Sequence, residues 1–146
     1  MLSVRNAGIA LLVGCSCLAQ ISPRPAANPG FQALVKEATA RIKEVTVPQL
    51  ELWLNSSTKP VVIDVREDTE WQAGRAAVAL HIGRGVLERD IETAVPKKDA
   101  LIVLYCQGGG RSALAADALQ KMGYTRVFSL AGGFNSYRLA GLPIQR

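Results

Sequence analysis

The sequence predicts an α/β domain with a mostly parallel sheet, and three observations lead to this prediction. Apolar, β-branched segments alternate with helix-like segments along the chain. Two of the apolar segments, 61–65 and 101–105, lack the polar alternation of a half-exposed strand, which is typical of strands covered by helices on both faces. The total of 146 residues is enough for one compact domain with one hydrophobic core.

The expected elements follow one another in a regular order. Apolar residues from Phe31 to Ile42 recur at helical spacing and predict a first helix. Pro48 suits the first turn of a helix that follows a short strand. The remaining elements are strands at 45–47, 61–65, 80–82, 101–105 and 127–130, helices or helical turns at 48–54, 67–72, 86–91, 112–122 and 132–140, and turns at 55–60 and 97–99.

The first 30 residues predict a leader and a linker. Residues 1–20 combine a positive charge at Arg5 with an apolar stretch too short to span a bilayer, which outlines a bacterial export signal. The proline-rich residues 21–30 predict a flexible tether, and the domain is expected to occupy residues 31–146.

The end of the leader resembles the lipobox of bacterial lipoproteins, in which the cysteine is lipidated and becomes the new N-terminus. The matching residues are Leu-Val-Gly-Cys, ending at Cys15, and Ser16 at the next position favours the outer membrane. This predicts an exported, periplasmic protein that is lipid-anchored to the outer membrane without spanning it. Cleavage after Ala19 and an uncleaved anchor are the alternatives.

Composition narrows the classes of partner. The formal net charge of +5 comes without a dense Lys/Arg block, which disfavours nucleic-acid binding and favours small anions or anionic membrane surfaces. Because Cys15 and Cys17 fall in the leader, the domain is expected to hold one thiol, Cys106, and no internal disulfide. The single histidine, His81, has no evident metal partner in the sequence, so no metal or other cofactor is expected. The oligomeric state stays open.

Cys106 begins the segment of greatest chemical interest. It lies at the tip of the strand 101–105, and the loop Gln107-Gly108-Gly109-Gly110-Arg111 leads from it into a helix at Ser112. Glycines allow several backbone N–H groups to point at one spot, and a helix N-terminus favours an anion there. Arg111 is expected to add a fixed positive charge. The loop therefore predicts a stabilised thiolate that acts as a nucleophile through a covalent intermediate.

Three segments together resemble the rhodanese-like (sulfurtransferase) family. They are Asp64-Val65-Arg66-Glu67 with Glu70-Trp71 and Gly74, then 105–113 around Cys106, and finally 130–137 with Gly141-Leu142-Pro143. The resemblance covers about residues 45–146. The sequence departs from the family pattern after Trp71, where Arg75 and Ala77 stand in place of the usual His and Pro.

The resemblance implies a three-layer α/β/α fold with a central, mostly parallel five-stranded sheet. It implies that Cys106 carries a sulfane sulfur as a persulfide. The sulfur would come from a small sulfur-containing anion such as thiosulfate and leave to cyanide or a thiol. Gln107 to Ser112 would form the binding loop, and Asp64 and Arg66 would support it by bonding to neighbouring loops.

Three other interpretations compete with this one. Cysteine-dependent phosphatases resemble His-Cys-x5-Arg, whereas four residues separate Cys106 from Arg111 and Tyr105 replaces the His. The smaller ring suits a sulfur atom better than a tetrahedral phosphate. Cys106 could also be an inert core thiol, although the flanking glycines argue against this. Finally, the domain could be a persulfide carrier or binding module that turns over little without a protein partner.

The predicted lipid anchor can be checked directly at the mature N-terminus. Mass spectrometry of the protein from a bacterial host should find acylated Cys15 as the first residue, because lipoprotein processing cleaves immediately before the lipidated cysteine. A free Gln20 at the N-terminus would contradict the lipoprotein prediction and leave a soluble periplasmic protein.

Overall fold

The computed structural model describes residues 28–146 and places five parallel strands at the centre of the domain. Their order across the sheet is β1 (Lys43–Val45), β6 (Val127–Leu130), β5 (Ile102–Tyr105), β2 (Val61–Asp64) and β4 (Ala79–His81). The predicted α/β class and the parallel five-stranded sheet are confirmed.

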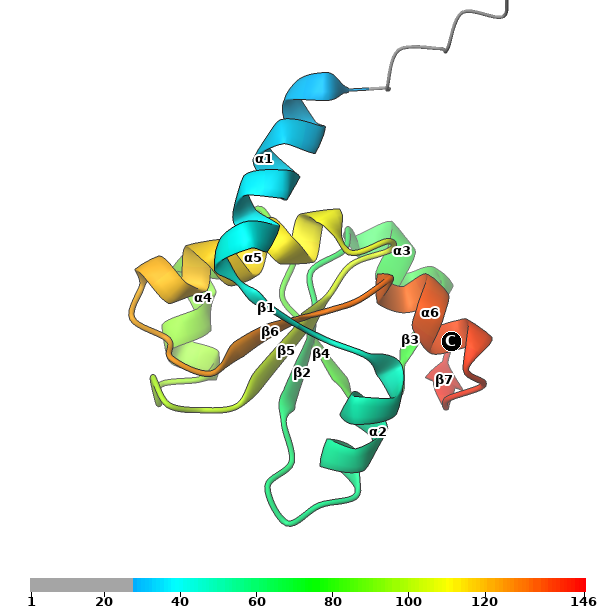
Figure 1. Cartoon of the computed structure of the whole chain (residues 1–146). Coiled ribbons are helices and arrows are strands. Elements are labelled where there is room, and N and C mark those ends of the chain that lie inside the picture. Colours follow the sequence, from blue (N-terminus) through cyan, green and yellow to red (C-terminus); the bar gives the residue numbers. More distant parts are fainter. Residues whose placement is uncertain (1–27) are drawn as a thin grey trace, which may run out of the picture.

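Helices cover both faces of this sheet. Helices α4 (Leu87–Ala94) and α5 (Gly110–Lys121) pack on one face, and α2 (Val47–Leu54) and α6 (Gly133–Leu139) pack on the other. Figure 1 shows α5 and α2 on opposite sides of the strands. The buried strand β5 alternates between the two cores, with Leu104 facing one and Val103 the other. Full burial of each such side chain contributes about 1.5–3 kcal/mol.

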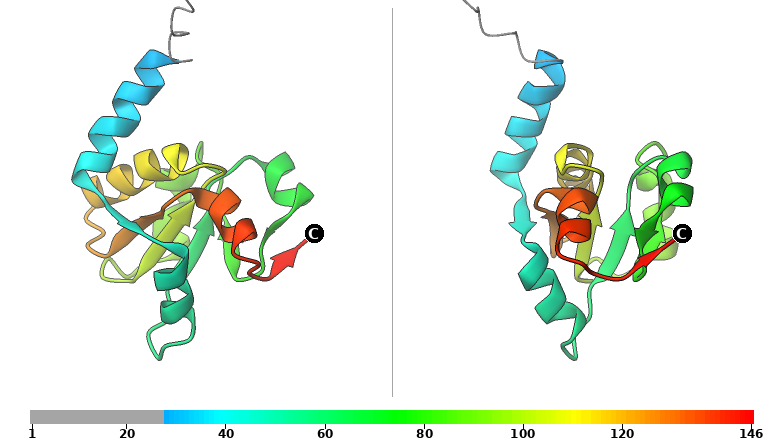
Figure 2. Two further views of the ribbon diagram at one scale, coloured as in Figure 1. Left: turned by 45° about the vertical axis from the view of Figure 1, so that its right-hand side comes forward. Right: turned by 90° about the vertical axis from the view of Figure 1, so that its right-hand side faces the viewer.

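The first helix, α1 (Pro29–Arg41), packs against α5. Its C-terminal Arg41 donates two hydrogen bonds of 2.8 and 3.0 Å to Asp117 on α5, and Lys121 donates a third of 2.7 Å. These cations hold the pKa of Asp117 well below its usual range. Figures 1 and 2 show α1 rising from the domain along one side. The helix begins at Pro29, inside the segment 21–30 for which a flexible tether is predicted.

Two details differ from the sequence-based expectation, besides the start of helix α5, which is Gly110 and not Ser112, so that Arg111 lies in its first turn. The first strand ends at Val45 because Thr46 caps helix α2, so Val47 belongs to the helix and not to a strand 45–47. The second detail is a short antiparallel pair that the sequence does not predict, formed by β3 (Arg75–Ala76) and β7 (Ile144–Gln145). Two-residue strands are too short to show a hydrophobic period.

The leader predictions, including the lipidation of Cys15, concern residues that lie outside the described part of the chain. They stay predictions. Within residues 28–146, no helix is long and apolar enough to cross a membrane.

The strand order creates a switch point between β2 and β5. After β2 the chain adds β4 on one side of it, and then returns to add β5 on the other side. In open parallel sheets, ligands bind outside the carboxyl ends of the strands at such a point. The two segments that leave this point are the one after Asp64 and the one that begins at Cys106.

Candidate functional site

Cys106 lies at the bottom of the loop between β5 and α5. The residue is only 2% exposed, and its Sγ accepts a hydrogen bond of 3.1 Å from the backbone N–H of Gly109. Gly109 has a φ of 104°, a conformation that favours glycine and turns its N–H back toward the sulfur at the start of α5. The loop is open at Gly108, which is exposed and where a Cβ would meet nothing within 4 Å.

The start of helix α6 holds the other side of this loop. The backbone N–H of Phe134 donates to the Cys106 carbonyl at 2.8 Å, and that of Asn135 donates to the Gln107 carbonyl at 3.1 Å. The approach is so close that a Cβ on Gly133 would overlap the Cys106 carbonyl oxygen and lie 2.9 Å from that of Gln107. Because residue 133 is a glycine, the start of α6 can pack directly against the backbone of the cysteine loop and hold it in place.

A hydroxyl group lies next to the sulfur on the α5 side. Ser112 Oγ is 3.7 Å from Cys106 Sγ and 3.0 Å from the Gly109 carbonyl, and Ser112 is fully buried. Together with the Gly109 amide, it gives the sulfur two polar hydrogens in an otherwise apolar environment. Such donors are suited to a negatively charged sulfur.

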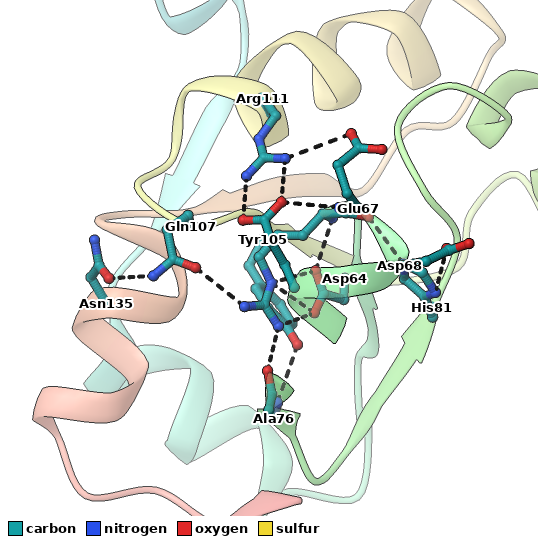
Figure 3. A network of polar contacts seen from close by, with 12 residues as sticks. Asp64, Glu67, Asp68, Ala76, His81, Tyr105, Gln107, Arg111 and Asn135 are labelled. Atoms are coloured by element: carbon teal, nitrogen blue, oxygen red, sulfur yellow. Dashed lines mark hydrogen bonds and ion pairs between the residues drawn. The ribbon is translucent and has the colours of Figure 1, made fainter. Parts of the chain in front are cut away.

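Arg111 points toward helix α3 (Asp68–Ala73), where Glu70 binds it. Its guanidinium makes two hydrogen bonds to the Glu70 carboxylate, at 2.7 and 2.8 Å, and lies 3.7 Å from Glu67. Figure 3 shows this arrangement. The hydrogen bonds from Arg111 lower the pKa of Glu70 to about 2. The positive charge expected beside the sulfur is therefore already matched by a carboxylate.

A second polar network is centred on the Arg66 side chain. Buried Arg66 makes a bidentate pair with buried Asp64, with a shortest contact of 2.6 Å, and donates to the Gly74 carbonyl at 2.7 Å. Burial works against the charge of Arg66, but the bonds to Asp64 outweigh this and raise the pKa of Arg66. Arg66 also donates to the side chain of Gln107, which in turn donates to Asn135 on α6 (Figure 3).

Gln107 thus connects the cysteine loop with Arg66, which follows strand β2, and with Asn135 on α6.

Tyr105, the residue before the cysteine, donates no hydrogen bond into the loop. Its hydroxyl oxygen accepts a hydrogen bond of 3.2 Å from the Ala76 N–H. Burial raises the pKa of Tyr105, so this phenol stays neutral.

Helix α1 reaches the loop from outside. A Cβ on Gly110 would lie 3.0 Å from the ring of Phe31 and 3.4 Å from Val35, so both side chains of α1 lie over the start of α5. A cavity of about 830 Å³ lies elsewhere, between the start of α3 and α4. Its lining includes Glu67, which approaches Arg111, but no residue of the loop 106–111.

The structure brings together most of the residues that the sequence singles out. Gly109 and Ser112 meet Cys106 at the sulfur, and Asp64, Arg66 and Gln107 are joined by hydrogen bonds in a separate network. Glu70 and Asn135 belong to the site as well, although the sequence assigns no role to either. Both lie in segments that carry the family resemblance, yet their partners are separated from them by 41 and 28 positions. Residues 28–146 contain no group of three His, Cys, Asp or Glu side chains arranged to hold a metal ion.

The close approach at Gly133 predicts a specific sensitivity to a methyl group. Gly133→Ala should lower the free energy of unfolding by about 2–4 kcal/mol, because the new Cβ overlaps the Cys106 carbonyl and an alanine is also strained at the φ of 57°. Gly141→Ala is the matched control, since its φ of 73° is equally positive but its Cβ would meet nothing within 4 Å. Equal losses in urea unfolding for the two variants would contradict the tight packing of α6 on the loop.

The lowered pKa of Glu70 predicts a pH-dependent contribution to stability. A carboxylate with a pKa of about 2 in the folded state and 4.5 in the unfolded state stabilises the fold above about pH 4.5, and this contribution disappears as the pH falls toward 2. Unfolding free energies of the wild type and Glu70→Gln should therefore differ by about 1 kcal/mol at pH 7 and converge only as the pH falls from about 4.5 toward 2. Exposed Glu51→Gln on α2 is the control. A difference that stays constant across this range would argue against the Arg111 pairing.

Comparison with known proteins agrees with this geometry. The family model described as "Rhodanese-like domain" matches residues 46–140. The chain is 34% identical over 94 residues to a probable adenylyltransferase/sulfurtransferase of Mycobacterium tuberculosis, with 64% of this chain covered but only 24% of that protein. It therefore spans about a quarter of the length of that relative. A sulfurtransferase of Allochromatium vinosum is 30% identical, with 70% of this chain and 94% of that protein covered.

Two solved structures show the same fold. A Rhodopseudomonas palustris protein of unknown function, titled a possible tyrosine phosphatase, has a TM-score of 0.70 at 32% identity and covers 85% of this chain and 100% of its own. The polysulfide-sulfur transferase homodimer from Wolinella succinogenes has a TM-score of 0.69 at 27% identity, over 80% of this chain and 87% of its own. With the parallel sheet, the cysteine loop at its switch point and a family match over most of the domain, this chain belongs to the rhodanese-like domain family.

Proposed function

We propose that this protein is a sulfurtransferase that carries a sulfane sulfur on Cys106. The family and its sulfurtransferase members support sulfur transfer in general. Thiosulfate is the proposed donor, and cyanide or a thiol is the proposed acceptor. Neither a metal nor an organic cofactor takes part in this scheme, because the thiolate itself is the nucleophile.

The observation that carries the proposal is the placement of Cys106 Sγ. The sulfur lies at the switch point of the sheet, under the N–H of Gly109 and beside the hydroxyl of Ser112. The Gly109 N–H is held by the loop backbone, and the buried Ser112 Oγ is held on α5, so only the Ser112 proton has to turn when a negative charge develops on the sulfur. An inert core thiol would need neither a positive-φ glycine above it nor polar hydrogens around it.

The reaction divides into two steps with a covalent intermediate. In the first, the Cys106 thiolate attacks the outer sulfur of thiosulfate, an S–S bond forms, and the donor's own S–S bond breaks with its electron pair leaving on sulfite. In the second, the acceptor nucleophile attacks the outer sulfur of the persulfide. The persulfide bond breaks, its electron pair returns to Cys106 Sγ, and cyanide leaves as thiocyanate. The thiolate is regenerated and charge is conserved in each step.

A persulfide would place the transferable sulfur farther out than the buried Cys106 thiol. Because an S–S bond is about 2.05 Å long, the added sulfur extends the side chain by roughly 2 Å beyond the 2%-exposed thiol. The next residue but one, Gly108, is exposed, and a Cβ there would meet nothing within 4 Å. A tetrahedral phosphate is larger than one sulfur, and only four residues separate Cys106 from Arg111, which argues against phosphatase chemistry.

The proposal predicts that the sulfur is carried by Cys106 and by no other thiol. The purified full chain should form thiocyanate from thiosulfate and cyanide, and Cys106→Ser should reduce this to the uncatalysed background. Cys17→Ser, the same change at a thiol outside the domain, should leave the rate unchanged. Intact mass should show one added sulfur on the wild type and none on Cys106→Ser. A wild type that forms no persulfide with any sulfane-sulfur donor would overturn the proposal.

A persulfide carrier that works with a protein partner is the second candidate. The burial of the thiol and the engagement of Arg111 by Glu70 favour it, because both limit how a small anion meets the sulfur. Under this alternative, intact mass would show a stable added sulfur while turnover with small acceptors stays negligible. Rapid thiocyanate formation from small substrates would instead favour the sulfurtransferase enzyme over the carrier.

A further inference from the structure

Two fully buried serines form a hydrogen-bonded pair, and one of them, Ser112, lies next to the Cys106 sulfur. Ser112 lies in the first turn of α5, whereas Ser129 lies on the neighbouring strand β6. Their Oγ atoms are 2.9 Å apart, and Ser112 Oγ is in turn 3.7 Å from Cys106 Sγ. The sequence predicts Ser112 as a loop residue and gives Ser129 no role.

The number of protons available to this pair limits how it can be arranged. Each hydroxyl has one proton to donate. Ser112 Oγ has three neighbours within range, namely Ser129 Oγ, the Gly109 carbonyl and Cys106 Sγ. Among the described residues, the only polar partner found for Ser129 Oγ is Ser112 Oγ.

Only one direction of the bond between the serines uses both protons. If Ser112 donated to Ser129, the Ser129 proton would be buried without an acceptor, which is unfavourable, and Ser112 would have no proton for the sulfur. If Ser129 donates to Ser112, the Ser112 proton is free to meet either the Gly109 carbonyl or Cys106 Sγ. The Gly109 carbonyl already accepts from the N–H of Ala113, so it loses little when that proton turns away.

We propose that Ser129 is a positioning residue, whose hydroxyl donates to Ser112 Oγ and so keeps the Ser112 proton available to the Cys106 sulfur. This rests on the proposed function, in which charge on Cys106 Sγ changes during the cycle. The Ser112 proton faces Sγ in the thiolate and turns to the Gly109 carbonyl in the persulfide, whose charge lies on the outer sulfur. It returns as the persulfide bond breaks and its electron pair reaches Sγ. No proton leaves Ser112 Oγ at any step.

Alkylation of Cys106 tests this without any sulfur donor. Iodoacetamide reacts with the thiolate, so its rate at pH 7 reports how well the anion is stabilised. Modification is followed by mass spectrometry on the tryptic peptide 99–111, which contains Cys106 and separates it from Cys15 and Cys17. Ser129→Ala should slow alkylation of the full chain by about threefold, since part of one hydrogen bond to the anion is lost.

A double-mutant comparison distinguishes positioning from a general packing effect. Ser129→Ala should have no further effect when Ser112 is already alanine, because its action passes through the Ser112 hydroxyl. Equal slowing in the Ser112→Ala and wild-type backgrounds would overturn the proposal, as would an unchanged rate in Ser129→Ala alone. Unfolding midpoints of all variants establish that each is folded at the assay temperature.

Ser129→Thr and Ser129→Val form a matched pair of nearly equal volume, of which only threonine keeps a hydroxyl. Threonine should alkylate near the wild-type rate and valine near the rate of Ser129→Ala. Equal rates for the two would contradict the proposal. If the wild type alkylates as expected but forms no persulfide, the proposed sulfur transfer fails while the role of Ser129 toward the thiolate is still decided.

Discussion

Two backbone hydrogen bonds from the start of α6 to the carbonyls of Cys106 and Gln107 hold the site in its shape. In a planar trans peptide, the C=O and the following N–H point in opposite directions. When these carbonyls face α6, the N–H groups of Gln107 and Gly108 must therefore face away from it. Gly133 allows this contact because no Cβ separates the two backbones. The connection from β6 to α6 thus determines which backbone groups the cysteine loop exposes.

In the proposed mechanism, negative charge on Cys106 Sγ meets mainly neutral groups. The two arginines of the polar network are each matched by a carboxylate, Arg66 by Asp64 and Arg111 by Glu70. What remains at the sulfur is a backbone amide and a serine hydroxyl, both in fixed positions. Preorganised dipoles of this kind stabilise charge without the reorganisation that mobile solvent or a flexible side chain would need. The arginines instead hold the loop, α3 and α6 in place.

The sequence was sufficient for the sheet, the order of its elements and the cysteine loop, because each is encoded locally by an apolar run or by glycines next to a nucleophile. It was not sufficient for the direction of Arg111. Adjacency in sequence predicts a charge close to the sulfur, and Arg111 does interact with Cys106 through its charge, but its hydrogen bonds go to Glu70, 41 residues away. The hydrogen bond between Ser112 and Ser129 depends on tertiary contacts, as does the pairing of β3 with β7. No local sequence pattern predicts either of them.

Helix α1 lies outside the residues 46–140 that match the family, yet it contacts the site through Phe31 at Gly110 and is fastened to α5 by Arg41 and Asp117. Thirteen helical residues form a stiff rod about 20 Å long. The direction in which the chain enters the domain is therefore fixed relative to the cysteine loop. The N-terminal end of α1 at Pro29 therefore keeps one position relative to Cys106, set by the contacts of Phe31 and Arg41 with α5.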